Sequence, residues 1–229
     1  MIHNIREKFA NFVIDNNVIG FFKEPITLKS GRVSYWYVNW RDIVADVYLT
    51  DELSDFIIKY VKELNLEPKC FFGVPEGATK IGLITQFKWA KSQNDYGEGE
   101  FILSMGRGAP KKHGQLKDRY YLGVPRGNLI ILEDVTTTGQ SLIEVVDKFL
   151  ELEIKITATI SLTNRDEIRP DGKTVEEILN TKDIPYYSMS NALELLPKIY
   201  QKTKIDQKIA RKVEEYFLEY GVKKLKLIY

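Results

Sequence analysis

Short apolar runs alternate along the chain with stretches whose apolar residues recur at helical spacing. The apolar runs cover residues 70–74, 101–104, 129–132 and 154–162, and the helical stretches cover 51–64, 78–91 and 142–150. A strand that is buried on both faces reads as a continuous apolar run. Alternation of such strands with helices is typical of a parallel sheet covered on both sides. The sequence therefore predicts an α/β fold with a central, mainly parallel sheet flanked by helices.

Both ends of the chain add elements to this pattern. Further helices are expected over 5–13, 174–179, 191–196 and 205–220, with extended pieces over 26–40 and near 185–187. Ser30 and Gly31 mark a turn in the first extended region, and Thr174 with Glu177 forms a capping-box pattern. The 229 residues are thus predicted to form one domain: an N-terminal hood (1–45), a core (46–200) and a C-terminal helical extension (201–229).

Charge and cysteine content exclude several classes of protein. The 33 basic and 32 acidic residues give a net charge of +1, so nothing global indicates binding to nucleic acid or an anionic membrane. Cys70 is the single cysteine, which excludes an intrachain disulfide, and with His3 and His113 it is too few for a His/Cys zinc site. No signal-peptide core is seen, and no apolar run approaches the roughly 20 residues that span a bilayer. A soluble, cytoplasmic protein is expected.

The most informative segment is 129–143, where an apolar strand runs through Glu133 and Asp134 into TTTGQS and a helix. Hydroxyls, a glycine and free N–H groups at a helix N-terminus form an anion cradle. Adjacent carboxylates suit hydroxyl groups, or a metal that phosphates also bind. A phosphorylated sugar meets both demands, with its 5-phosphate on the Thr/Gly/Ser loop and its vicinal hydroxyls at the acids. The alternative is an acidic turn in which a threonine or serine only caps the helix.

Ligands of parallel sheets bind at the carboxyl ends of the strands. The loops after Val74, Ser104, Leu132 and Leu162 are therefore expected to share one cleft. This topology brings the acidic segment together with the other segments described next.

Segment 129–143 resembles the phosphoribosyl pyrophosphate (PRPP) motif of type I phosphoribosyltransferases. Four other segments resemble motifs of the orotate phosphoribosyltransferases, in family order: TLKSGRVSYWYVN (27–39), FGVPEGATKIG (72–82), RGAPKKHG (107–114) and LTNRDE (162–167). The resemblance implies the type I phosphoribosyltransferase fold and transfer of 5-phosphoribosyl from PRPP to N1 of orotate. The products are orotidine 5′-phosphate and pyrophosphate, in pyrimidine (UMP) biosynthesis. The resemblance also implies that the reaction uses Mg²⁺, which oxygens of PRPP would chiefly hold without a cage of protein ligands.

The resemblance also implies roles for individual residues. The expected catalytic residues are Asp134, Lys111 and His113. The residues expected to bind PRPP are Arg107, Lys111, His113, Glu133, Asp134, Thr136, Thr137, Thr138, Gly139, Gln140 and Ser141. Those expected to bind orotate are Lys29, Tyr37, Thr137 and Arg165. Arg165 would donate two parallel hydrogen bonds to the orotate carboxylate; otherwise it is a surface residue paired with Asp166 or Glu167. Without these roles, Lys29 is a solvated turn residue and Tyr37 packs in the core.

Residues 106–117 form a basic stretch that contains Arg107, Lys111 and His113. Positive side chains that close over a site stabilise the charge of departing pyrophosphate and exclude water. His113 is suited to donate a proton to a pyrophosphate oxygen. In the family that the chain resembles, this loop reaches the partner's site, which implies a homodimer. The plain alternative is an exposed basic loop.

Three positions depart from the family's pattern: Gly108 replaces a common lysine, Tyr35 a proline, and Glu76 a residue that is usually not acidic. Two other functions therefore stay open. One is a phosphoribosyltransferase for another base, although Arg165 has little purpose with a neutral purine. The other is a catalytically weak, PRPP-sensing regulatory protein. Such a protein would lose the catalytic loop, so the presence of Lys111 and His113 disfavours it. Other nucleotide-binding classes are disfavoured, because neither GxxxxGK[ST] nor GxGxxG after a strand occurs.

Overall fold

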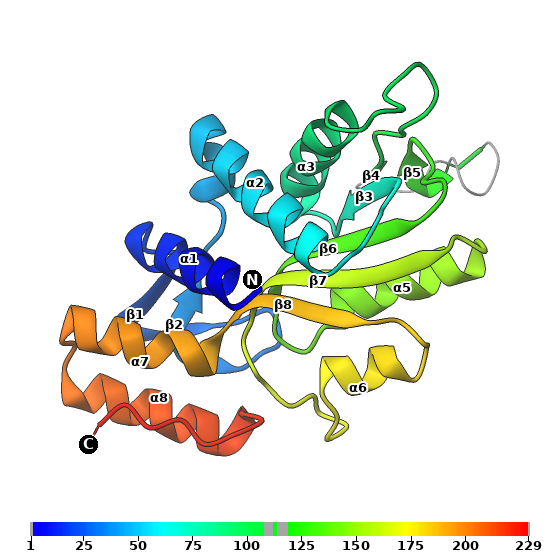
Figure 1. The fold of residues 1–229 in the computed structure, drawn as a ribbon. Coiled ribbons are helices and arrows are strands. Elements are labelled where there is room, and N and C mark those ends of the chain that lie inside the picture. Colours follow the sequence, from blue (N-terminus) through cyan, green and yellow to red (C-terminus); the bar gives the residue numbers. More distant parts are fainter. Residues whose placement is uncertain (1, 108–111, 114–118, 229) are drawn as a thin grey trace.

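The computed structural model describes residues 2–107, 112–113 and 119–228. A four-stranded sheet in the order β3-β6-β7-β8 forms its centre, and each neighbouring pair of strands is parallel. Its strands are β3 (Cys70–Gly73), β6 (Leu129–Thr136), β7 (Ile156–Asn164) and β8 (Tyr186–Asn191). Helices lie on both sides of this sheet (Figure 1). The predicted α/β fold with a central parallel sheet flanked by helices is confirmed.

The two covered faces explain the unbroken apolar runs. Along β6, Ile130 and Leu132 belong to one buried cluster, and Leu129 and Ile131 belong to the other. Successive side chains of a strand point to opposite faces, so a strand between two cores needs apolar residues at every position. The first cluster includes residues of α1 (Ile2–Asp15), α2 (Val47–Glu63) and α3 (Thr79–Lys91). The second includes residues of α5 (Gln140–Glu151) and α6 (Val175–Asn180), and α6 begins with the expected capping box.

The N-terminal hood and the C-terminal helices lie next to each other beside the sheet (Figure 1). The hood contains an antiparallel pair, β1 (Ile19–Thr27) and β2 (Val33–Val38), followed by the short helix η1 (Ile43–Ala45). After β8 come α7 (Ala192–Thr203) and α8 (Gln207–Tyr220). The rings of Trp36 and Phe217 stack with centroids 5.7 Å apart, which joins the hood to α8. The boundaries at residues 45 and 200 stay predictions, and α7 spans the second of them.

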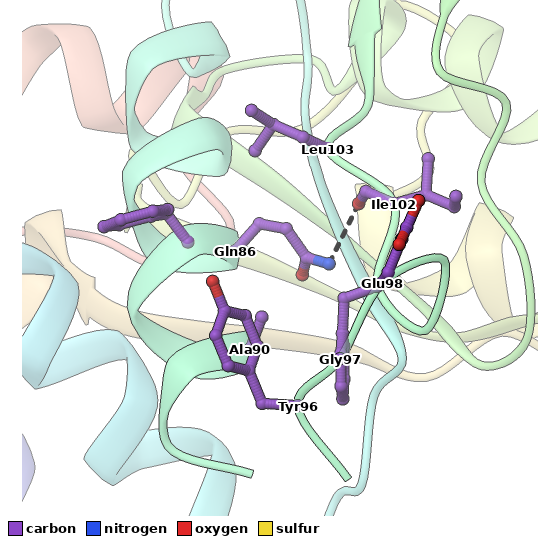
Figure 2. A pocket seen from close by; sticks show the side chains of 9 residues that line it. Gln86, Ala90, Tyr96, Gly97, Glu98, Ile102 and Leu103 are labelled. Carbon is purple, nitrogen blue, oxygen red and sulfur yellow. Dashed lines mark hydrogen bonds between the residues drawn. The ribbon is translucent and has the colours of Figure 1, made fainter.

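The apolar run 101–104 is not a strand of the sheet, which corrects the sequence prediction. β3 is an edge strand, and the Gln86 side chain takes the place of a next strand. The Phe71 N–H donates to Gln86 Oε1 at 2.9 Å. Gln86 Nε2 in turn donates to the Ile102 carbonyl at 2.9 Å, as the dashed line in Figure 2 marks. Pairing begins only beyond this run, where β4 (Met105–Gly106) meets β5 (Tyr121–Leu122).

The strand β6 also extends further than predicted. It pairs with β7 as far as Thr136 opposite Asn164, so both carboxylates stand within the strand. Within the described ranges, no helix combines the length and the apolar character needed to cross a membrane.

Candidate active site

Three loops meet at the carboxyl edge of the sheet, as the parallel topology predicts. A Cβ atom on Gly77 would lie 2.3 Å from the Asp134 carboxylate, so the loop after β3 approaches the end of β6. The loop after β7 joins them through a 2.9 Å hydrogen bond from the Arg165 N–H to the Thr136 carbonyl. The resemblance motifs 72–82, 129–143 and 162–167 are therefore neighbours in space.

The turn between β6 and α5 has the features of an anion cradle. Gly139 stands at the N-cap of α5 with φ of +69°, and no side chain caps the helix. The first N–H groups of a helix have no acceptor within it, and with the helix dipole they favour an anion. Arg169 holds the turn through a 2.5 Å hydrogen bond from Nη1 to the Thr138 carbonyl. The Gln140 side chain instead donates to Glu144, at 2.9 Å along α5.

The adjacent carboxylates have different surroundings. Glu133 is 8% exposed, and its Oε2 has no hydrogen-bond partner in the described part of the chain. Asp134 is half-buried. Burial, then the charge of Asp134 and a hydrogen bond with it, raise the pKa of Glu133 well above its ordinary value, and Lys29 acts in the opposite direction. Hydroxyl donors of a ligand would give the unpartnered oxygen the hydrogen bond that it lacks.

We expect Glu133→Gln to flatten the pH dependence of stability in the ligand-free protein. An acid with a raised pKa in the folded state stabilises the fold below its unfolded pKa, and this stability is lost as the pH rises through the folded pKa. The wild-type free energy of unfolding should therefore fall more steeply from acid to alkaline pH than that of the variant. Urea unfolding at several pH values measures the difference.

The pKa of Asp166, which burial raises to about 6, affects both proteins alike and cancels in this comparison. Parallel pH profiles for the wild type and Glu133→Gln would contradict the assignment of a strongly raised pKa to Glu133.

Lys29 reaches the cradle from the hood. Its Nζ donates to the Ser141 Oγ at 3.4 Å, although the side chain is exposed. Tyr37 is half-buried in β2, where it pairs with Gly20 of β1. Thr137 is half-buried directly after β6. Lys29 thus lies beside α5, and the contact of these three residues with a base stays a prediction.

Arg165 has a different environment from the one expected at a cleft end. It is 1% exposed, and its Nε donates to Glu167 Oε1 at 2.6 Å. The guanidinium carbon lies 3.6 Å from the centre of the Trp36 ring. The pairing with Glu167 that was the alternative for Arg165 is observed, but in the interior of the protein. Its contact with a ligand carboxylate stays a prediction.

The predicted catalytic loop lies partly outside the described residues, which do not include Lys111. His113 is exposed and Arg107 is half-buried. The loop begins beside the loop after β3, because a Cβ atom on Gly106 would lie 2.6 Å from Cγ of Pro75. The start of the basic stretch is therefore close to the carboxyl edge of the sheet, while the roles of its residues stay predictions.

Sequence reasoning missed three residues around this site: Gly77, Arg169 and Val175. Gly77 lies inside a segment already singled out, where the glycine itself was a usable signal. Arg169 and Val175 have no local pattern, because they reach the cradle only when the chain after β7 folds back against it.

No family model matches the chain, but curated proteins similar to it are orotate phosphoribosyltransferases. The orotate phosphoribosyltransferase of Aquifex aeolicus is 29% identical over 192 residues, which cover 83% of this chain and 97% of that protein. The orotate phosphoribosyltransferase of Agathobacter rectalis is 26% identical over 234 residues, which cover 97% of this chain and 100% of that protein. The similarity thus extends over nearly whole chains.

Solved structures show the same fold. The orotate phosphoribosyltransferase of Francisella tularensis superposes with a TM-score of 0.67 at 19% identity, over 93% of this chain and 99% of that one. The orotate phosphoribosyltransferase of Mycobacterium tuberculosis in complex with PRPP gives a TM-score of 0.56 at 15% identity, over 83% and 98%. With motifs in family order and similarity over nearly whole chains, this protein is similar to the orotate phosphoribosyltransferases and has the fold of their solved structures.

Proposed function

We propose that the protein transfers the 5-phosphoribosyl group of PRPP to N1 of orotate, giving orotidine 5′-phosphate and pyrophosphate. The observation that carries this proposal is the pair Glu133 and Asp134 near the carboxyl end of β6, which residues 135–139 connect to the uncapped N-terminus of α5. It joins acceptors for ribose hydroxyls to a cradle for a phosphate. The reaction belongs to pyrimidine (UMP) biosynthesis, and the cytoplasm is its proposed place.

PRPP would bind across the end of β6. Residues 136–141 take the 5-phosphate through hydroxyls and N–H groups, and the two carboxylates accept hydrogen bonds from the ribose hydroxyls. The unpartnered Glu133 Oε2 fits this arrangement. Oxygens of PRPP would chiefly hold Mg²⁺, which would supply positive charge that neutralises the leaving group.

Orotate would lie between the hood and the end of β7. Lys29 and Tyr37 come from the hood, Thr137 follows β6, and Arg165 follows β7. A guanidinium matches the planar orotate carboxylate with two parallel, charge-assisted hydrogen bonds. The carboxylate distinguishes orotate from uracil and from the purines.

The reaction needs stabilised charge and no covalent intermediate. The bond between C1 of the ribose and pyrophosphate breaks, and pyrophosphate leaves with the electron pair. N1 of orotate forms the new bond to C1 and releases its proton to solvent. Positive charge develops on the sugar and negative charge on the leaving group. We assign Asp134 to stabilise the positive charge on the sugar. We assign Lys111 and His113 to stabilise the leaving pyrophosphate, with His113 as its proton donor.

The proposal is tested by the consumption of bases with PRPP and Mg²⁺. Orotate, adenine, hypoxanthine, xanthine and uracil are offered separately, and the expected result is consumption of orotate alone. Consumption of a different base would overturn the role given to Arg165. If no base reacts, calorimetric binding of PRPP would indicate a regulatory protein, and absence of binding would overturn the cradle.

We expect Gly139→Ala to weaken PRPP binding about tenfold or more, and to destabilise the fold by about 1–3 kcal/mol. The position has φ of +69°, and an added Cβ would lie 2.3 Å from Val175 Cγ2, so the turn must move. Calorimetry with Mg²⁺-PRPP and urea unfolding measure the two effects. Gly172→Ala is the matched control, since φ there is +79° with open space around the new Cβ. Equal PRPP affinity in both variants would contradict the prediction.

A homodimer is also part of the proposal. Phe87 and Leu103 are each 53% exposed, and both line a hollow of about 340 Å³ (Figure 2). Leu122, which is 43% exposed, lies in β5 opposite Met105. Grouped, exposed apolar side chains mark interaction surfaces. A second copy is the proposed occupant, because the basic loop starts beside this surface and would then extend towards the partner's site.

We expect Phe87→Glu to produce a monomer and to lower kcat about tenfold or more, because a central apolar anchor carries a large share of interface energy. Sedimentation velocity gives the mass, and initial rates give kcat. Leu218→Glu on α8, where the leucine is 62% exposed, is the matched control and should remain dimeric. A dimeric Phe87→Glu with wild-type kcat would place the interface elsewhere.

A further inference from the structure

The C-terminal extension contacts the segment that carries Arg165. The chain after α8 runs antiparallel to this segment. The Ile168 N–H donates to the Tyr220 carbonyl at 2.7 Å, and the Val222 N–H donates to the Asp166 carbonyl at 2.8 Å. An isolated antiparallel bridge lies between these two bonds. The extension is therefore attached by its backbone to the loop that follows β7.

Glu167 lies between two arginines in the interior. Its Oε1 accepts a hydrogen bond from Arg165 Nε at 2.6 Å, and its Oε2 accepts one from Arg32 Nη1 at 2.5 Å. The side chain of Glu167 is completely buried. The guanidinium of Arg32 lies 4.5 Å from the centre of the Tyr220 ring. One carboxylate thereby connects the hood, the loop after β7 and α8.

Tyr216 of α8 closes another side of Arg165. Its hydroxyl oxygen accepts from Arg165 Nη2 at 3.4 Å, as does Ser34 Oγ at the same distance. Glu167, Ser34 and Tyr216 thus accept from Nε and Nη2 of Arg165, and the ring of Trp36 covers one face of the guanidinium. In the described part of the chain, no hydrogen bond involves Nη1. Nη1 therefore keeps its N–H groups for a carboxylate that approaches the end of the guanidinium shared by Nη1 and Nη2.

We infer that Tyr216 and Glu167 are positioning residues for base recognition, which hold the Arg165 guanidinium so that its Nη1–Nη2 edge meets the orotate carboxylate. The inference rests on the proposed function and gives the C-terminal extension a part in it. A side chain that is ordered before the ligand arrives loses less conformational entropy on binding. Loss of a positioning contact should therefore weaken orotate binding and leave PRPP binding unchanged.

The test compares Tyr216→Phe with Tyr220→Phe in the full chain. Both variants lose one phenolic hydroxyl from α8, but the hydroxyl of Tyr216 contacts Arg165, whereas Tyr220 contributes its ring to Arg32. For Tyr216→Phe we expect the KM for orotate to rise about three- to tenfold, since a hydrogen bond to a charged group is lost. The KM for PRPP should stay at the wild-type value, and the thermal midpoint should fall by about a few degrees at most. Tyr220→Phe should match the wild type in all three.

A second variant, Glu167→Asp, keeps the charge between the two arginines and withdraws the carboxylate by one methylene. It should raise the KM for orotate about tenfold or more with little change in the KM for PRPP, because a charge-assisted bond is displaced. A wild-type KM for orotate in Tyr216→Phe, or equal rises for orotate and PRPP in both variants, would overturn the inference while the proposed function stands. Failure of the wild type to use orotate would overturn both.

Discussion

Asp134→Asn is expected to lower kcat/KM for PRPP about 100- to 1000-fold, the range found when one preorganised electrostatic group is removed from a site. The carboxylate stands at the end of β6 beside Gly77 and next to the cradle. Its charge would stabilise the cationic sugar, which an amide of the same shape cannot do. Initial rates at varied PRPP with saturating orotate give the loss, and reverse rates from orotidine 5′-phosphate should fall alike.

The matched control for this change is Asp147→Asn. Asp147 lies on α5, and its carboxylate pairs with Lys182 at 2.7 Å on the surface. It should retain the wild-type kcat/KM, because exposed ion pairs contribute little. Asp134→Asn at wild-type activity would remove this carboxylate from the reaction and leave the cradle as a binding site alone.

Arg165→Ala is expected to raise the KM for orotate about 100-fold, because two charge-assisted hydrogen bonds to the substrate carboxylate are lost together. The KM for PRPP should change little, since the cradle belongs to a different element. The change also leaves Glu167 with Arg32 as its remaining ion-pair partner in a buried site, so a lower thermal midpoint is expected. Comparing the KM for orotate with the KM for PRPP therefore separates a loss of orotate recognition from a general loss of folded protein.

Arg165→Lys and Arg126→Ala complete this experiment. Lysine keeps the charge but not the planar fork, so most of the loss in orotate affinity should remain while stability partly recovers. Arg126 is exposed, two residues before Asn128 at the amino end of β6, and its removal should have no effect. A rise in the KM for PRPP equal to that for orotate would show that Arg165 acts only through the fold.

Local sequence patterns predicted a large part of the fold. The runs around Phe71, Ile131 and Ile160 became strands because both faces of each are covered, a demand that leaves a continuous apolar pattern. The capping box at Thr174 formed as predicted, since its hydrogen bonds join residues only three positions apart. Elements whose stabilising contacts are local in the chain can be recognised without the rest of the molecule.

The run 101–104 shows where such patterns fail. Its apolar residues were compatible with a strand, but the edge of β3 was already paired with the Gln86 side chain of α3. Strand formation depends on a partner, and apolar periodicity does not indicate which partner is free. Likewise the surroundings of Arg165 depend on Tyr216, which is 51 residues away in the chain.

The parallel α/β architecture, the acidic pair at the end of β6 and the glycine before α5 could be predicted from the sequence, because they follow from contacts between near neighbours and from residue chemistry. The folded chain was needed to show that Gly77 meets Asp134, that Glu167 links Arg32 to Arg165, and that α8 covers this group. A buried charge takes its partners from whichever segments the fold brings to it. Those partners came from segments that carry no common pattern.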